Sequence, residues 1–360
     1  MAGPEPHTTT VPAATPRRLL LVSIPRTASN LLAKILNISN QPNLVTNQKA
    51  GYFFFPAYIE AAASNYKKKS IDHWTDDEKT HVKHSFQECF NTLEEFSTQA
   101  ENNHQMMFTK EHAYFFYSPA ALLKSYTGIH DEEFFKSFRL DMPEKYGPTQ
   151  TSSQFNETIL SDEYLRSWQM AFIIRHPALA WPSMYRAMLK VGEIGMLDED
   201  GVKGASFTNM DMRWTRLLYD WCMEQPDAPV QPPIIDAHDL IHNPEVVLKF
   251  CERTGLDKSV VQFEWKDKND AKKSAKWDNG DPNASAEEVQ KNLSAASVML
   301  ATLENSSGIV KDKAPEVIDI DAEAVKWRKE FGEETGALVE EYVRKSMPDY
   351  EYLKARRITV

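Results

Sequence analysis

The 360-residue sequence predicts an α/β fold with a central parallel sheet between two layers of helices, on the strength of three observations. Short apolar runs that suit buried strands recur along the chain, each run ends in a polar turn, and each turn leads into apolar residues at helical spacing. Such alternation over one continuous span is typical of a three-layer α/β/α domain. The carboxyl ends of parallel strands share one edge of the sheet, so a ligand is expected at these turns.

The first unit organises the chain. Residues 19–24 (LLLVSI) form an apolar run that only Ser23 interrupts, and they predict the first strand. A turn with Arg26 follows, and a helix is expected to begin at Thr27 or Ala28. The free backbone N–H groups and the dipole of that helix start, with nearby hydroxyls and a guanidinium, favour a phosphate or sulfate site.

Later segments complete the predicted domain. Further strands are expected at residues 105–110, 170–174 and 234–235, one or two helices within 61–105, a helix ending at Gly255 as its C-cap, and helices at 286–305 and 321–346. We therefore expect a disordered tail at 1–16 and a single domain at 17–353. That domain carries helical insertions at about 60–105 and 118–167 and a charged mobile loop at about 264–292.

Polar residues follow the second strand directly. Lys110, Glu111 and His112 stand at its end, where open α/β sheets place their ligands. A histidine in this position acts either as a structural hydrogen-bonding group or as a base, and Lys110 as a functional cation or a solvated charge.

Aromatic residues flank this strand end in the sequence. They either pack in the core or line a pocket for an apolar or aromatic acceptor. The candidates are Tyr52, Phe53, Phe54, Phe55, Tyr114, Phe115 and Tyr185, with Phe116 and Tyr117 beside them.

Composition narrows the functional classes. The net charge of −11 and the pI near 5.5 argue against a general nucleic-acid binder or a protein that binds anionic membranes. The three cysteines form no CxxC pair and suit buried thiols in a reducing compartment. With neither a signal peptide nor an apolar span recognisable, a cytoplasmic protein is expected, and the scattered histidines and cysteines predict no metal site.

Three segments together resemble the sulfotransferases that use 3′-phosphoadenosine-5′-phosphosulfate (PAPS). The segment from Pro25 to Leu32 (PRTASNLL) is similar to the 5′-phosphosulfate loop of that family, often PRSGT or PKSGT before an apolar helix. Arg175-His176-Pro177, with Ser183 on the following helix, is similar to the 3′-phosphate motif. Residues 234–256 are similar to the family's "dLl.nPe..l..fc..lGl" segment.

The sequence departs from the family pattern in three places. Ala28 stands where glycine is usual, and His176 stands where aspartate or asparagine is common. The C-terminal RKGxxGDWKNxFT segment is not visible, and its nearest stand-in is Ser306, Ser307, Gly308 and Ile309 with Lys311 and Lys313. A Walker A loop, G-x-x-x-x-G-K-[ST], is also missing from the first turn, which disfavours an ATPase or GTPase.

The resemblance implies a P-loop-like nucleotide-binding core and a sulfuryl transfer from PAPS to a hydroxyl or amine, with adenosine 3′,5′-bisphosphate as the second product. It implies donor binding by Arg26, Thr27, Ala28, Ser29, Asn30, Leu31, Arg175 and Ser183. His112 corresponds to the family's catalytic histidine, Glu111 is the rival base, and Lys110 supports the sulfuryl group. Arg175 in a surface ion pair is the alternative for that residue.

The expected partner is a small acceptor alcohol or phenol, with neither nucleic acid nor membrane, and a homodimer is possible. A non-catalytic binding protein or a kinase-like enzyme of the same fold remains the alternative function.

Overall fold

The computed structural model of the chain describes residues 18–47, 51–63, 69–225, 231–265 and 286–360. The predicted tail at 1–16 and most of the predicted charged loop at 264–292 lie outside these residues.

A five-stranded, all-parallel sheet forms the centre of the fold, which confirms the predicted α/β class. The strand order is β2-β3-β1-β4-β5. Each of the four predicted strands is present, and the short strand β2 was not predicted. The strands are β1 (Arg18–Ser23), β2 (Leu44–Val45), β3 (Met106–His112), β4 (Gln169–Ile174) and β5 (Ile234–Asp236).

Helices surround this sheet. The α-helices are α1 (Ser29–Ile35), α2 (Phe55–Ala63), α3 (Asp76–Asn102), α4 (Pro119–Thr127), α5 (Glu132–Ser137), α6 (Asp162–Leu165), α7 (Pro177–Glu193), α8 (Glu199–Asn209), α9 (Arg213–Glu224), α10 (Ala237–His242), α11 (Pro244–Thr254), α13 (Ala286–Glu304), α14 (Ile320–Phe331) and α15 (Glu333–Lys354). Short 3-10 helices lie at Ile38–Asn40, Ile71–His73, Ala113–Phe115, Glu144–Tyr146, Lys258–Val260 and Lys311–Lys313.

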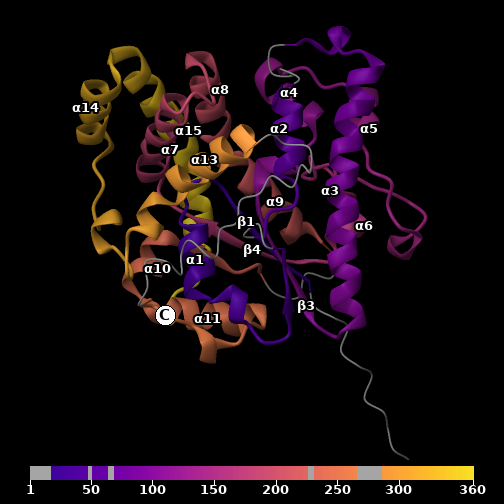
Figure 1. Cartoon of the computed structure of the whole chain (residues 1–360), viewed down its shortest axis with the longest axis horizontal. Helices are drawn as coiled ribbons and strands as arrows, with labels where there is room; N and C mark the ends of the chain where they lie inside the picture. The colour runs from indigo at the N-terminus through magenta and orange to yellow at the C-terminus, as the bar shows by residue number, and fades with distance from the viewer. Residues whose placement is uncertain (1–17, 48–50, 64–68, 226–230, 266–285) are drawn as a thin grey trace, which may run out of the picture.

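The sheet has an apolar core on each face, because its strands alternate between two sets of buried side chains. Leu20 and Val22 of β1 belong to a core shared with α2, α3, α7, α9 and α15. Leu19 and Leu21 point to the opposite face, where they join residues of α1, α10 and α11. Figure 1 shows α3 along one side of the sheet and α14 on the opposite side of the molecule. The architecture is therefore three-layered.

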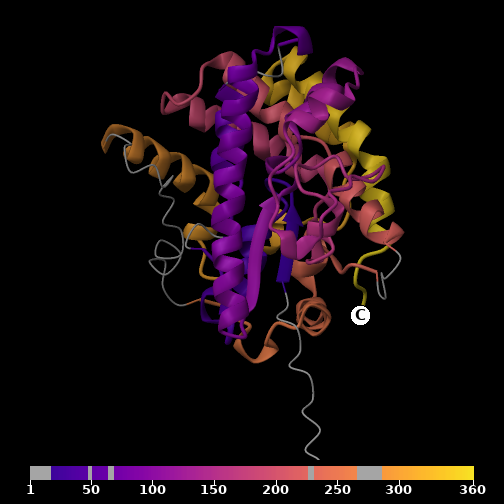
Figure 2. The same cartoon turned by 90° about the vertical axis from the view of Figure 1, so that its right-hand side faces the viewer.

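Helices lie in both segments where insertions were expected, and side chains from both segments contribute to the core. Helix α3 begins with a capping box in which Thr75 and Glu78 satisfy each other's backbone N–H groups. It then runs along most of the height of the molecule (Figure 2). From the second insertion, Phe134 and Phe138 pack edge-on against Trp74, with ring centroids 5.6 and 5.7 Å away. The second of these segments is therefore partly buried.

The single helix predicted at 321–346 is wrong, because Gly332 divides it into α14 and α15. Gly332 has a φ of 87°, a left-handed conformation that glycine adopts without a steric penalty. The chain reverses there, since Arg328 donates to Glu340 and Arg344 donates to Asp321 across the pair. At Gly336 a Cβ atom would lie 2.5 Å from the backbone of Arg328, so a side chain would force the two helices apart.

Strand β1 lies at the centre of the sheet, between β3 and β4. The chain leaves β1 toward β2 and β3 on one side and later crosses to β4 and β5 on the other. A reversal of strand order of this kind opens a crevice at the carboxyl ends of the strands, where ligands of open α/β folds bind. Among the described helices, none has both the length and the apolar composition of a transmembrane span.

Candidate functional site

The loop after β1 holds two non-glycine residues in the left-handed region. Arg26 has a φ of 68° and Ala28 a φ of 67°. Such a conformation costs an L-residue on the order of 1–2 kcal/mol, which explains why glycine is usual in the motif at the position of Ala28. The strained turn nevertheless forms, and the expected helix begins at Ser29, one or two residues later than predicted.

The donors of this loop divide into two groups. Thr27 is fully buried, and both its backbone N–H and its hydroxyl donate to the Ile24 carbonyl, at 3.3 and 2.6 Å. The first N–H groups of α1, at Ser29, Asn30 and Leu31, have no acceptor within the helix, and no side chain caps this end. Thr27 therefore fixes the turn, while the following N–H groups point away from the helix toward the crevice.

The second motif lies directly against the first. The guanidinium of Arg26 donates through Nε to the hydroxyl of Ser183 on α7, 3.0 Å away. Arg175, at the end of β4, donates through Nη1 to the Arg26 carbonyl at 2.9 Å. Two segments about 150 residues apart in the sequence thus form one cationic site.

His176 takes over the role of an aspartate or asparagine at the start of α7. Its Nδ1 accepts from the Ala178 backbone N–H at 3.1 Å, which is the N-cap contact that those side chains make. Burial and the nearby Lys354 lower the pKa of His176 to about 4, so its ring is neutral and Nδ1 can accept. The histidine at position 176 therefore keeps the N-cap hydrogen bond of α7 that an aspartate or asparagine would make.

The two arginines form no ion pair with the described carboxylates, and the charge of Asp236 acts on Arg175 from a longer distance. No such carboxylate lies within ion-pair distance of Arg26 or Arg175, although the chain is acidic overall. Burial and the charge of Arg26 lower the pKa of Arg175 to about 10, and burial lowers the pKa of Arg26. The Nε–H of Arg175 is buried without an acceptor in the described structure. A site of this composition favours a multiply charged anion.

A backbone carbonyl of the C-terminal part accepts one further N–H group of each arginine. Arg26 Nη1 donates to the Met299 carbonyl in α13 at 2.6 Å, and Arg175 Nη2 donates to the Lys313 carbonyl at 2.8 Å. The segment named above as a stand-in for the family's C-terminal motif therefore reaches Arg175 through a carbonyl oxygen.

Lys110, at the end of β3, is fully buried beneath the first loop. Its ammonium donates to the side-chain oxygen of Asn30 and lies 4.4 Å from the centre of the Tyr52 ring. Burial lowers the pKa of Lys110 to about 7, and the adjacent Glu111 opposes that shift. The ammonium of Lys110 therefore titrates near neutral pH and contacts the loop that follows β1.

Glu111 points to the opposite face of β3. Its Oε1 accepts from the backbone N–H groups of Phe53 and Phe54, at 2.5 and 3.1 Å, and its Oε2 has no hydrogen-bond partner in the described structure. Burial raises the pKa of Glu111 to about 8, against the effect of those two hydrogen bonds and of Lys110. This carboxyl anchors the aromatic segment after β2.

Both ring nitrogens of His112 are hydrogen-bonded. Nδ1 lies 2.8 Å from the hydroxyl of Ser23, and Nε2 lies 3.0 Å from the hydroxyl of Tyr52. Burial, together with the charge of Lys110, lowers the pKa of His112 well below its ordinary value of 6.5. The ring is therefore neutral at pH 7, and one of its nitrogens carries a lone pair.

Most of the predicted acceptor-lining aromatics form one cluster around Phe115. Its ring lies 5.0 to 5.7 Å from those of Tyr52, Phe55 and His112, and 4.8 Å from that of Tyr114. Tyr185 packs elsewhere, against Phe207 of α8 and Phe331 of α14. Phe53 contacts Phe96, Phe54 contacts Phe116, and Tyr117 packs on Trp214.

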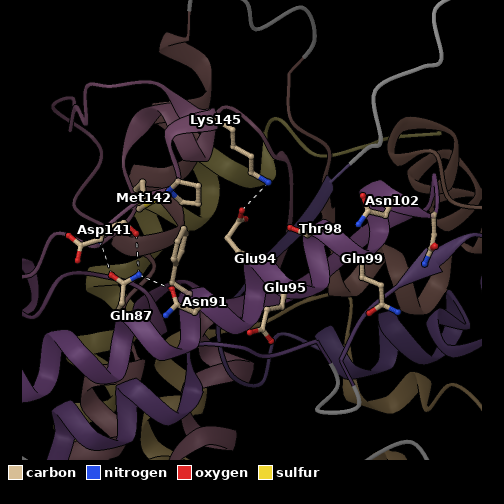
Figure 3. A pocket seen from close by; sticks show the side chains of 13 residues that line it. Gln87, Asn91, Glu94, Glu95, Thr98, Gln99, Asn102, Asp141, Met142 and Lys145 are labelled. Carbon is tan, nitrogen blue, oxygen red and sulfur yellow. Dashed lines mark hydrogen bonds and ion pairs between the residues drawn. The ribbon is translucent and has the colours of Figure 1, made fainter.

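A groove of about 1100 Å³ follows the surface of α3, away from this site. In Figure 3, Gln87 bonds to Asn91 and to Asp141, and Lys145 pairs with Glu94. Glu94 also pairs with Arg18, the first residue of β1, at 3.2 Å. The groove therefore lies near the amino end of β1, at the edge opposite the arginines. No cluster of three or more potential metal ligands occurs among the described residues.

Sequence reasoning missed Ser23 and the carbonyls of Met299 and Lys313. Ser23 carried a signal, since it is the one polar residue in the apolar run 19–24 and a buried hydroxyl needs a partner. The two carbonyls carried none, because every residue has a backbone carbonyl.

Two curated proteins align with nearly the whole chain. The sulfotransferase ppzF of Metarhizium rileyi is 36% identical over 359 residues, covering 95% of this chain and 96% of that protein. The sulfotransferase ppzF of Metarhizium majus is 36% identical over 361 residues, covering 95% and 97%. Among solved structures, the sulfotransferase domain from the Synechococcus PCC 7002 olefin synthase aligns at 12% identity with a TM-score of 0.35, covering 88% of this chain and 95% of that domain. No family model matches.

Proposed function

Because this chain belongs to the sulfotransferase family, we propose that it moves a sulfuryl group from PAPS to a hydroxyl or amine of a small apolar or aromatic acceptor. One observation carries the proposal beyond family membership. Two half-buried arginines from two separate motifs meet without an ion pair to a described carboxylate, and Arg175 keeps a buried N–H without an acceptor.

The charge pattern supports PAPS as the donor. PAPS carries a phosphate at the 3′ position of its ribose and a phosphosulfate at the 5′ position. Two anionic groups suit a site with one cation after β1, Arg26, and another after β4, Arg175. Arg26 and the N–H groups of Ser29, Asn30 and Leu31 bind the 5′-phosphosulfate, with Thr27 and Ala28 shaping the turn. Arg175 and Ser183 bind the 3′-phosphate.

The reaction is a sulfuryl transfer that needs a base and a stabilised leaving group. The acceptor oxygen bonds to sulfur, the bond between sulfur and the 5′-phosphate oxygen breaks, and its electron pair leaves with adenosine 3′,5′-bisphosphate. Arg26 and Lys110 stabilise the negative charge that grows on the transferring group and the leaving oxygen. His112 takes the proton of the acceptor, which its neutral ring permits. Glu111 is the less favoured base, since its Oε1 already accepts two backbone N–H groups.

The aromatic cluster around Phe115 supports an apolar or aromatic acceptor, because it adjoins the imidazole of His112. We include in the proposal a cytoplasmic location, a small alcohol or phenol as acceptor, neither nucleic acid nor membrane as partner, and a possible homodimer. The three free, buried cysteines agree with a reducing compartment.

Calorimetric titration of the full chain tests the donor site. We expect micromolar binding of adenosine 3′,5′-bisphosphate and none of ATP, since the site lacks a triphosphate loop. The reverse order would support a kinase-like protein and end the proposal. Transfer of sulfate from PAPS to a panel of alcohols and phenols then tests turnover. Tight bisphosphate binding with no transfer to any of them would indicate a binding protein.

A further inference from the structure

The side chain of Ser23 lies between the imidazole of His112 and the backbone of Glu111, both on the neighbouring strand β3. It is the last residue of β1, pairs in parallel register with His112, and is 0% exposed. Its Oγ is 2.8 Å from His112 Nδ1 and 3.1 Å from the Glu111 carbonyl oxygen. A buried hydroxyl thus touches a ring nitrogen and a carbonyl at once.

The hydroxyl has one hydrogen, so the two contacts fix its direction. The Glu111 carbonyl can only accept, and it therefore takes the hydrogen of Ser23. The oxygen of Ser23 must then accept from Nδ1–H of His112. In the opposite arrangement the hydroxyl would donate to Nδ1 and set two oxygen lone pairs against each other at 3.1 Å.

The second ring nitrogen fits the same direction. With Nδ1 protonated in a neutral ring, Nε2 carries the lone pair and accepts from the hydroxyl of Tyr52 at 3.0 Å. The side chain of Ser29 is also hydrogen-bonded to the Tyr52 hydroxyl. The hydroxyl of Ser23 then donates once, to the Glu111 carbonyl, and accepts once, from Nδ1–H of His112.

We propose that Ser23 is a positioning residue that holds His112 in the Nδ1–H tautomer and so makes Nε2 the nitrogen that receives the acceptor proton. This inference rests on the proposed function. As the acceptor oxygen bonds to sulfur, its proton moves to the Nε2 lone pair and the ring becomes an imidazolium. The Nδ1–H bond to Ser23 stays in place and stabilises the positive charge. The Tyr52 hydroxyl is displaced from Nε2 by the acceptor.

Nitrogen NMR of the protein with 15N-labelled histidine tests the tautomer without any turnover. The chain has 10 histidines, so His112 is assigned from the signals that disappear in His112→Ala. We expect Nδ1 of His112 at the position of a protonated ring nitrogen and Nε2 far downfield, as a nitrogen with a lone pair. An Nε2–H tautomer in the unmodified protein overturns the proposal, whatever the activity.

Two variants test the consequence for catalysis. Ser23→Ala is expected to mix or reverse the tautomers and to lower kcat about tenfold with little change in KM, a part of the 10²–10⁴-fold that a base contributes. Ser23→Thr, which keeps the hydroxyl, is expected to restore the tautomer and most of kcat. Ser206→Ala is the matched control, since Ser206 is also 0% exposed and loses one hydroxyl bond, to the Val202 carbonyl.

A double-mutant cycle separates positioning from general packing. In the His112→Ala background, Ser23→Ala is expected to have no further effect on kcat, because the base on which it acts is missing. An equal tenfold loss in both backgrounds would make Ser23 a packing residue and refute the proposal. A protein with the Nδ1–H tautomer but no sulfate transfer would refute the proposed function instead.

Discussion

Replacing Arg175 with methionine tests whether this arginine recognises a 3′-phosphate. The change keeps an unbranched side chain of similar reach and removes the charge and the buried Nε–H that has no acceptor in the described structure. That N–H is available to a phosphate oxygen at no loss of a protein hydrogen bond. The two Nη donors already bond to carbonyls, of Arg26 and of Lys313.

The size of the effect follows from that one donor. A hydrogen bond between charged partners contributes about 1.5–3 kcal/mol, and about 1.4 kcal/mol changes affinity tenfold. Arg175→Met is therefore expected to weaken adenosine 3′,5′-bisphosphate about 10- to 150-fold. Adenosine 5′-monophosphate, which lacks the 3′-phosphate, should lose much less affinity.

Calorimetric titration with both nucleotides measures the ratio of their affinities, which cancels any general loosening of the site. Arg186→Met, on the helix α7 that follows Arg175, is the matched control, because Arg186 is exposed and pairs with Glu330. It should leave the ratio unchanged. If Arg175→Met also preserves the ratio, this residue does not bind the 3′-phosphate and the pairing of the two motifs needs another explanation.

Three further predictions concern the base, a buried acid and the strained loop. His112→Ala should lower kcat by about 10²–10⁴-fold while adenosine 3′,5′-bisphosphate binds as before in the same titration, and full turnover would exclude this base. Burial raises the pKa of Glu111 to about 8, so between about pH 4.5 and 8 the folded protein holds a proton that the unfolded chain releases. The free energy of unfolding of the wild-type protein should therefore fall, relative to that of Glu111→Gln, as pH rises through that window. The expected fall is at most about 1.4 kcal/mol per pH unit, measured by denaturant titration at each pH. Parallel pH curves of the two proteins would contradict the raised pKa. Ala28→Gly should raise the free energy of unfolding by about 0.5–1 kcal/mol, because a φ of 67° strains alanine but not glycine, and a loss of stability would argue against that backbone conformation.

The strands that sequence reasoning located are those buried on both faces. Their continuous apolar runs stand out against charged surroundings, as in β1 and β4. Strand β2 escaped prediction because it has two half-buried residues that pair only with β3. The division of the last helix at Gly332 was missed as well, because a single glycine among good helix formers does not by itself predict a reversal of the chain.

The candidate site was predictable in its residue types and less so in its contacts. The family suggested by three short segments is confirmed by the relatives, and the structure places Arg26 against Ser183 and beside Arg175. The hydrogen-bond acceptors of the two arginines include the backbone carbonyls of Met299 and Lys313, which lie far away in the sequence. The partner of Ser23 depends on the register of two parallel strands, which no local pattern specifies.

The contacts that assemble the site join distant parts of the chain, and this has a consequence for folding. Ser23 and His112 are separated by 89 positions, Arg175 and Lys313 by 138, and Arg26 and Ser183 by 157. Contacts of such long range form late and slow the search for the native state. On the proposed function, a partly folded chain with β1 and α1 in place would have the loop after β1 but would lack Arg175 and an oriented His112. Nucleotide recognition should therefore return only in the last phase of refolding, together with the docking of the C-terminal segment.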